Sequence, residues 1–136
     1  MTEAIHEGGC LCGAIRYRCE GKPYNTNVCF CNQCLRHTGA AMPAFAAFKL
    51  DRFRLLSGAP ATYRSSSFAT RSHCARCGSA LFWQRDGADM LDVFLGTFDA
   101  PDRLPPPDDQ LWTEHRVPWL ADLPGIPAYP RERGSR

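Results

Sequence analysis

The chain has 136 residues, of which 44% are hydrophobic and 22% are charged, and its formal net charge is +2. This length suits one folded domain, the composition excludes wholesale disorder, and the small charge argues against a nucleic-acid binder driven by phosphate contacts. No secretory signal opens the chain, and its longest apolar run, residues 40–48, is shorter than the roughly 20 residues of a membrane helix, so we expect a cytoplasmic protein without a membrane partner.

An alternating segment follows a polar lead-in. Residues 14–20 alternate apolar with charged side chains, which is the period of a half-buried strand. Cys19 belongs to the apolar side of this pattern, so we expect it to face the core. A glycine-flanked turn precedes the strand, and a Gly-Lys-Pro turn ends it.

A cysteine-rich loop and a buried strand come next. Three cysteines fall within residues 29–34, and residues 35–39 predict a loop or a short turn. Residues 40–48 predict a buried strand, because Pro43 disfavours a long helix there.

The second half of the chain predicts a series of short strands. Residues 51–56 are compatible with either a helical turn or a short strand, whereas residues 62–65 and 68–72 predict a hairpin. Further apolar strands are expected at residues 80–84 and 90–98. Many short strands separated by turn signals indicate an all-β domain.

The end of the chain is rich in proline. Residues 101–110 combine proline with aspartate and predict a loop or mobile flap, and residues 111–119 form a last aromatic segment. Beyond it, prolines and charges predict an extended tail. We therefore divide the chain into a folded domain over residues 1–120, which contains every cysteine, and a proline-rich tail over residues 121–136.

Two cysteine pairs share a pattern that predicts a structural metal site. In each pair the second cysteine is followed by glycine, at Gly13 and Gly78. Glycine tolerates a positive φ, so the backbone can turn its amides toward the thiolates and offset their charge. Four thiolates of this kind would close the coordination of one zinc ion and tie distant segments together. The set comprises Cys10, Cys12, Cys74 and Cys77.

The loop cysteines Cys29, Cys31 and Cys34 predict a second metal site. Three thiols on so short a segment cannot readily pair as disulfides, but they can all bind one zinc ion. Three ligands leave the fourth tetrahedral position open, which is typical of catalytic zinc. The alternative is a second structural site completed by a fourth protein ligand. The candidates for that ligand are Cys19, His37, His73 and His115.

Other chemistry is weakly indicated. Arginines near the cysteines form either a solvated face or an attraction for the carboxylates of an anionic substrate, and they are Arg36, Arg71 and Arg76. The chain has no glycine-rich phosphate loop, nucleophile elbow or dinucleotide fingerprint. Metal or thiol chemistry is therefore the main option.

The cysteine clusters and their neighbours resemble a known family. The segments 9–13, 29–34, 74–79 and 96–99 look like those of the glutathione-dependent formaldehyde-activating enzyme family, also called the Gfa or centromere protein V family. The similarity runs from Gly8 to Trp119. It implies an all-β, Mss4-like fold of small antiparallel sheets built around zinc sites.

The resemblance also implies an activity. It assigns a structural zinc to Cys10, Cys12, Cys74 and Cys77, and a catalytic zinc to Cys29, Cys31 and Cys34. The implied reaction joins glutathione to formaldehyde to give S-hydroxymethylglutathione, or runs in reverse as a carbon–sulfur lyase.

The chemistry of three thiolate ligands supports a thiol substrate. Thiolates make zinc a weaker Lewis acid than neutral histidines do, and a sulfur ligand suits such an ion. A substrate thiol held there as thiolate would add to an aldehyde carbonyl. We expect a zinc-dependent carbon–sulfur lyase with a small thiol such as glutathione and an aldehyde as partners. The alternatives are a non-catalytic zinc-binding interaction module and a thiol or metal sensor.

Overall fold

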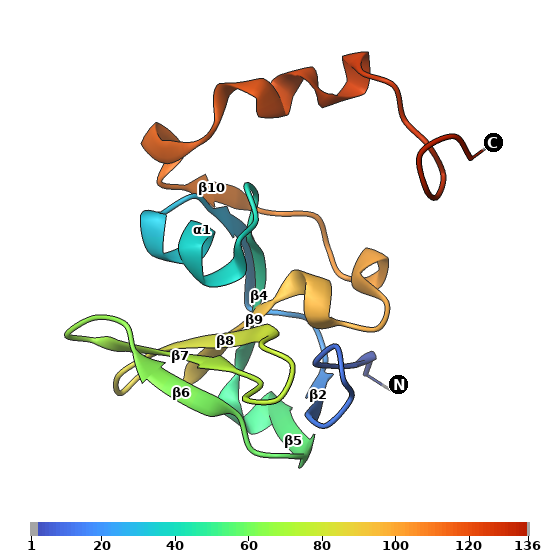
Figure 1. The fold of residues 1–136 in the computed structure, drawn as a ribbon. Coiled ribbons are helices and arrows are strands. Elements are labelled where there is room, and N and C mark those ends of the chain that lie inside the picture. Colours follow the sequence, from blue (N-terminus) through green and yellow to red (C-terminus); the bar gives the residue numbers. More distant parts are fainter. Residues whose placement is uncertain (1–2, 136) are drawn as a thin grey trace.

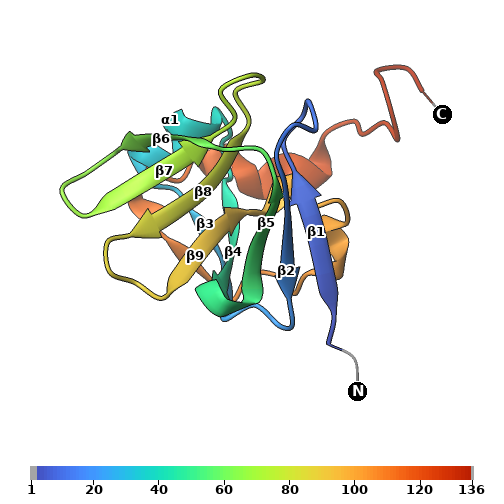
Figure 2. The ribbon, with the colours of Figure 1, turned by 90° about the horizontal axis from the view of Figure 1, so that it is seen from below.

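The computed structural model describes residues 3–135, which form two β-sheets (Figures 1 and 2). Strands β1 (Ile5–Gly9), β2 (Arg16–Glu20) and β5 (Phe53–Ser57) make a three-stranded antiparallel sheet in the order β1-β2-β5. The second sheet has seven strands in the order β10-β3-β4-β9-β8-β7-β6. Its strands are β3 (Asn25–Cys29), β4 (Ala44–Lys49), β6 (Ala61–Arg64), β7 (Ala69–His73), β8 (Ala80–Arg85), β9 (Met90–Phe94) and β10 (Asp109–Leu111). The expected all-β architecture is confirmed.

Most strand pairs are antiparallel, as predicted, but β10 joins the sheet differently. It pairs in parallel with β3, with Leu111 opposite Cys29. The amide of Phe30 also donates to the carbonyl of Leu111 over 2.9 Å. A segment late in the chain is therefore fixed beside the cysteine-rich loop, although residues 101–110 were predicted to be a loop or mobile flap.

The predicted loop over residues 35–39 is wrong, because an α-helix, α1 (Asn32–Thr38), occupies this stretch. Cys31 caps its N-terminus, since the Cys31 sulfur accepts a hydrogen bond from the amide of Cys34 over 3.3 Å. Gly39 ends the helix at φ 68°, and its amide donates to the carbonyl of Leu35 over 2.8 Å. Cysteine is not among the preferred capping residues, so the helix start carried little sequence signal.

The other differences from the predicted elements concern where strands begin and end, and short 3₁₀ helices lie between several of them. The ambiguous residues 51–56 contain both alternatives, and the strand expected over 90–98 ends at Phe94. The strand expected over 40–48 begins only after Pro43. The 3₁₀ helices are η1 (Leu50–Arg52), η2 (Leu95–Thr97), η3 (Pro101–Arg103), η4 (Thr113–His115) and η5 (Pro118–Gly125).

The main core lies between the two sheets. The alternation in β2 behaves as predicted, because Tyr17 and Cys19 have no exposed surface. The Tyr17 ring contacts those of Phe82 and Phe98 edge-on, with both centroid distances at 5.4 Å. Burial of such large rings supplies much of the apolar free energy that holds the sheets together.

The other face of the seven-stranded sheet carries the cysteine-rich loop. Paired residues of neighbouring strands point to the same side of a sheet, and alternate residues along a strand share a face. The register places one set of side chains on this second face, namely Asn27, Phe45, Arg71, Trp83, Asp92 and Phe94. Helix α1 covers part of it, since His37 packs edge-on against Phe94 at 5.2 Å.

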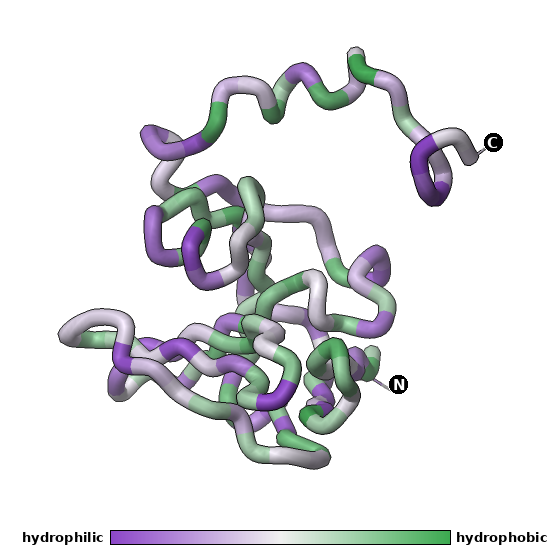
Figure 3. Tube along the Cα trace, viewed as in Figure 1, coloured by the Kyte–Doolittle hydropathy of each residue, from purple (hydrophilic) through white to green (hydrophobic). Residues whose placement is uncertain are grey.

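The C-terminal segment runs away from the body of the molecule beyond α1 and β10 (Figure 1). Hydrophobic residues recur along it (Figure 3), and Trp119, Leu123 and Ile126 are exposed. Helix η5 spans the boundary placed at residue 120, so the division into domain and tail stays a prediction. Within residues 3–135, no helix is long and apolar enough to cross a membrane.

Candidate metal centre

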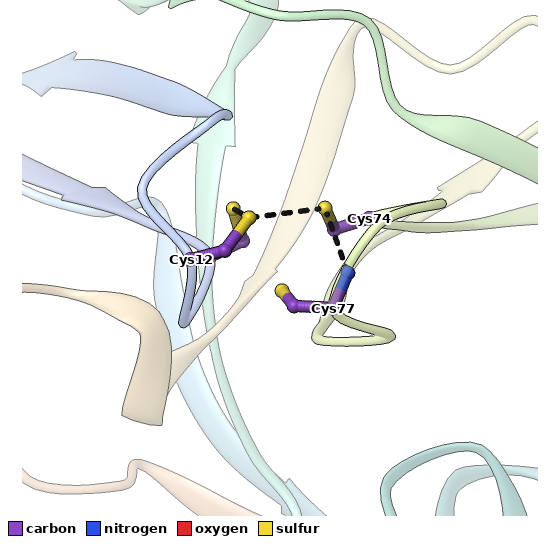
Figure 4. A group of neighbouring side chains, drawn as sticks. Cys12, Cys74 and Cys77 are labelled. Carbon is purple, nitrogen blue, oxygen red and sulfur yellow. Dashed lines mark hydrogen bonds between the residues drawn. The ribbon is translucent and has the colours of Figure 1, made fainter.

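Four cysteines meet where the turn after β1 approaches the turn after β7. The sulfurs of Cys10, Cys12, Cys74 and Cys77 all lie within 4.8 Å of one another. Figure 4 shows Cys12 facing Cys74 and Cys77 across the gap between the two turns. The sulfurs of Cys10 and Cys12 are 3.6 Å apart, and those of Cys12 and Cys74 are 3.8 Å apart. A tetrahedral zinc with Zn–S bonds of ~2.3 Å separates its sulfurs by about 3.8 Å, so the residues fit this ion.

The two turns supply hydrogen bonds to the sulfurs. Gly13 and Gly78 have φ values of 81° and 80°, which confirms the expectation drawn from the glycines. The amide of Ile15 donates to the Cys10 sulfur over 3.2 Å, and the amide of Cys77 donates to the Cys74 sulfur over 3.4 Å. Such bonds favour the thiolate form that binds metal.

The Cys77 thiol has a further polar neighbour in the same turn. The Ser79 hydroxyl lies 3.3 Å from the Cys77 sulfur. This hydrogen bond lowers the pKa of Cys77 to about 5, so the thiolate predominates at neutral pH.

The second cluster lies at the junction of β3 and α1. The sulfurs of Cys29, Cys31 and Cys34 are within 4.8 Å of one another. Cys29 ends the strand, Cys31 caps the helix and Cys34 lies in the first helical turn. The hydrogen bond from Cys34 lowers the pKa of Cys29 to about 6. Three converging soft donors suit zinc, so both clusters are consistent with zinc sites.

The three sulfurs are not joined by a fourth protein ligand in the described part of the chain. Among residues 3–135, no further cysteine, histidine or carboxylate atom belongs to this cluster. The Nδ1 atom of His37 instead lies 3.3 Å from Nη1 of Arg71, which donates to it. Burial and the Arg71 charge lower the pKa of His37 to about 4. Cys19 lies in the main core, where burial raises the pKa of its thiol to about 12.

Arg71 is a buried partner of the cluster. It has 5% exposure, and its Nη2 atom donates to the Cys34 sulfur over 3.4 Å. Its positive charge would offset the negative charge of a metal-bound Cys34 thiolate. Neither this role nor the burial of Arg71 was predicted from the sequence. Arg36 and Arg76, in contrast, are exposed.

A cavity of about 510 Å³ opens beside the three cysteines. Its other walls come from the second face of the large sheet, from α1, from the connection between β6 and β7, and from β10 with the segment after it. The polar wall residues carried little sequence signal. One signal was present, because Asp92 is a lone carboxylate in an otherwise apolar strand. The remaining lining residues are Asn27, Asn32, Gln33, Phe45, Ser66, Phe68, Arg71, Trp83, Asp92, Leu111, Trp112 and His115.

Comparison with known proteins gives the family. The sequence model of the GFA family, described as glutathione-dependent formaldehyde-activating enzyme, matches residues 5–115. The chain belongs to this family. The resemblance seen in the sequence is thereby confirmed, and the sheets with their two cysteine clusters form the expected Mss4-like fold.

Two individual proteins are similar to this GFA chain. A Halomonas elongata protein, whose name marks it provisionally as a glutathione-dependent formaldehyde-activating enzyme, is 30% identical over 124 residues. The match covers 84% of this chain and 78% of that protein. A crystal structure of a Rhodobacter sphaeroides protein superposes with a TM-score of 0.57 at 25% identity, covering 68% of this chain and 87% of the other.

The extent of the GFA match coincides with the site. It ends at His115, which is also the last residue along the chain to line the cavity. Both cysteine clusters and all the cavity walls therefore lie inside the matched segment, and helix η5 lies outside it.

Proposed function

We propose that this GFA protein is a zinc-dependent carbon–sulfur lyase that acts on thiol–aldehyde adducts of the S-hydroxymethylglutathione type. The observation that carries the proposal is the cluster of Cys29, Cys31 and Cys34, which borders a cavity and has no fourth ligand among residues 3–135. The family description and the name of the Halomonas protein support glutathione and formaldehyde as the two components.

The two clusters take different roles in this proposal. The four-cysteine cluster holds a structural zinc, because its coordination is complete and joins two sheets. Zinc bound by the three-cysteine cluster supplies a position at which a thiol sulfur is held in its reactive, deprotonated form. Eight free thiols among the described residues suit the reducing cytoplasm.

The protein residues around the second cluster prepare it for this chemistry. Arg71 offsets the negative charge of Cys34, and the cavity gives the aldehyde a place beside the sulfur. In the forward direction the thiol loses its proton, its sulfur adds to the carbonyl carbon, and the carbonyl oxygen gains one proton. The reverse reaction returns the hydroxyl proton as the carbon–sulfur bond breaks, so atoms and charges balance in both directions.

NMR exchange spectroscopy tests the proposal, because it measures the rate of exchange both with the protein and without it. The uncatalysed rate is the reference. The zinc-loaded protein should accelerate the interconversion of the free reactants, glutathione and formaldehyde, with their adduct. Cys34→Ala should abolish the acceleration and remove one zinc equivalent, while the protein stays folded. Cys19→Ala is the matched control, since that thiol lies in the core, and it should retain both zinc and activity. An exchange rate equal to the uncatalysed one with fully loaded protein would disprove the enzyme function.

The interaction module remains a second candidate because of one feature. That function predicts an exposed apolar or basic surface away from the metal sites, and Trp119, Leu123 and Ile126 provide exposed apolar side chains. These residues lie outside the cavity and the family match. Removing residues 121–136, which takes away Leu123 and Ile126, therefore separates the two functions, because only an interaction role would depend on them.

A further inference from the structure

Asp92 is a carboxylate in the wall of the cavity. It lies on β9, a central strand flanked by β4 and β8, and is paired with Ala47 and Trp83. Its side chain is half-buried and lines the same cavity as the three cysteines. Within residues 3–135, no hydrogen bond or salt bridge reaches this carboxyl group. A half-buried carboxylate without a partner is costly, so its environment is informative.

The other ionisable groups of the cavity do not neutralise Asp92. Arg71 directs its terminal nitrogens to Cys34 and His37, and its Nε atom is buried without a partner. His115 stacks on Trp112, and its Nε2 atom lies 3.5 Å from a carboxylate oxygen of Glu114. Three thiolates bound to one zinc ion add a further negative charge to the cavity.

The surroundings of Asp92 favour a cation. Burial, together with the charge of Cys29, raises the pKa of Asp92 to about 6, so the group is ionised at neutral pH and above. Aromatic side chains form much of the remaining wall, namely Phe45, Phe68, Trp83 and Trp112. A free ring face attracts cations, although Arg85 already lies over the Phe68 ring at 4.6 Å and His115 stacks on Trp112. A ligand carboxylate, in contrast, would meet a like charge and no free arginine or lysine among the described lining residues.

We propose that the cavity selects thiols that carry an ammonium group, with the sulfur at the three-cysteine cluster and the ammonium at Asp92. This inference rests on the proposed function, because it requires thiol binding at that cluster. Glutathione meets the requirement for an ammonium group, because it carries one. Its two carboxylates, however, would find no attractive charged partner in this wall. Small aminothiols such as cysteamine are the preferred class.

Calorimetric titration of the zinc-loaded protein with three thiols of equal length tests the charge preference. Cysteamine is cationic, 2-mercaptoethanol neutral and mercaptoacetate anionic, and titration above the pKa of Asp92 keeps the carboxylate ionised. Cysteamine should bind most tightly and mercaptoacetate most weakly. Asp92→Asn should weaken cysteamine binding roughly tenfold, as expected for loss of one partly buried charge pair, and should leave 2-mercaptoethanol within about twofold.

Asp89→Asn provides the matched control. Asp89 lies just before β9, is exposed, and pairs with Lys49 over 3.1 Å outside the cavity. This variant should keep the wild-type order of affinities. The wild-type ranking also stands as a test by itself if Asp92→Asn does not fold.

The outcomes separate the two proposals. Binding of all three thiols with no charge order, or an unchanged cysteamine affinity in Asp92→Asn, overturns the aminothiol preference and leaves the proposed function standing. No binding by any thiol to fully loaded protein overturns both.

Discussion

At the scale of single residues, Arg71 shows how the fold adapts a thiolate site. A buried guanidinium beside Cys34 would be unfavourable without a negative partner, and a buried thiolate would be unfavourable without a positive one. The hydrogen bond from Nη2 to the sulfur satisfies both. His37 completes the arrangement by accepting from Nη1. The cluster therefore depends on a residue that is far from it in sequence and is not a ligand.

Replacing Arg71 should weaken the second metal site selectively. Arg71→Leu keeps a buried apolar stem but leaves the Cys34 thiolate without its positive partner, so zinc affinity at this cluster should fall by roughly 10–100-fold. The four-cysteine cluster should keep its zinc. Competition with a chromogenic chelator measures both affinities. Arg36→Leu is the control, because Arg36 is exposed, and equal affinities in the two variants would show that Arg71 does not support the site.

The residue scale also shows where sequence patterns succeed and fail. The spacing of the cysteines predicted both clusters, and the glycines after Cys12 and Cys77 supported the first, because turns that bind metal are local structures. Asp92 and Asn27 were missed as cavity residues, since they reach the site through strand pairing. Trp112 has φ 58°, which is rare for a bulky side chain and which no local pattern indicated.

At the scale of elements, α1 is the part that sequence patterns described least well. It has seven residues, which is too short to show a clear helical period. Its ends are fixed by Cys31 and Gly39, and Cys34 is its buried residue. Likewise, no sequence pattern indicated a strand at β3, whereas its pairing with β4 and β10 makes it one. Alternating segments such as β2 were predictable because their burial pattern is local.

The left-handed end of α1 gives a prediction for the helix as a unit. Gly39→Ala should destabilise the protein by about 1 kcal/mol, because alanine is strained at a positive φ. A Cβ at this position would meet no atom within 4 Å, so the effect is one of backbone strain alone. Denaturant unfolding of the zinc-loaded protein measures the change in the free energy of unfolding.

Gly96→Ala is the control for this experiment. Its Cβ would also meet nothing within 4 Å, but Gly96 does not have a positive φ. Equal stabilities for the two alanine variants would contradict the role of Gly39. Because Cys34 lies in α1, the Gly39 variant should also release zinc from the three-cysteine cluster more readily.

At the scale of the whole molecule, the two clusters are placed differently in the fold: one joins two sheets, and the other lies within a single segment. The four-cysteine cluster joins the three-stranded sheet, through the turn after β1, to the seven-stranded sheet, through the turn after β7. The three-cysteine cluster lies within one continuous segment at the edge of the cavity. Loss of metal should therefore affect folding at the first cluster and function at the second.

Cysteine variants test this division. Cys77→Ser should give insoluble or unfolded protein, because the link between the sheets is lost. Cys34→Ala should lose one zinc equivalent with a small change in thermal unfolding. Metal analysis together with circular dichroism follows both. Soluble Cys77→Ser with unchanged metal content would contradict the structural role of the first cluster.

The C-terminal boundary gives a second prediction at this scale. A chain that ends at residue 120 should keep its unfolding temperature and its exchange rate, because the described residues 121–135 line neither the cavity nor the core. Thermal unfolding and NMR exchange check the two quantities. A lower unfolding temperature would show that the tail belongs to the domain.

The parallel pairing of β10 with β3 has a consequence for the order in which the protein is made. The ribosome releases both cysteine clusters before it releases Leu111, Trp112 and His115, which complete the cavity wall. During that interval the three-cysteine cluster is open on the side that β10 later covers. The cavity beside the three cysteines is therefore complete only after the chain has emerged from the ribosome as far as His115.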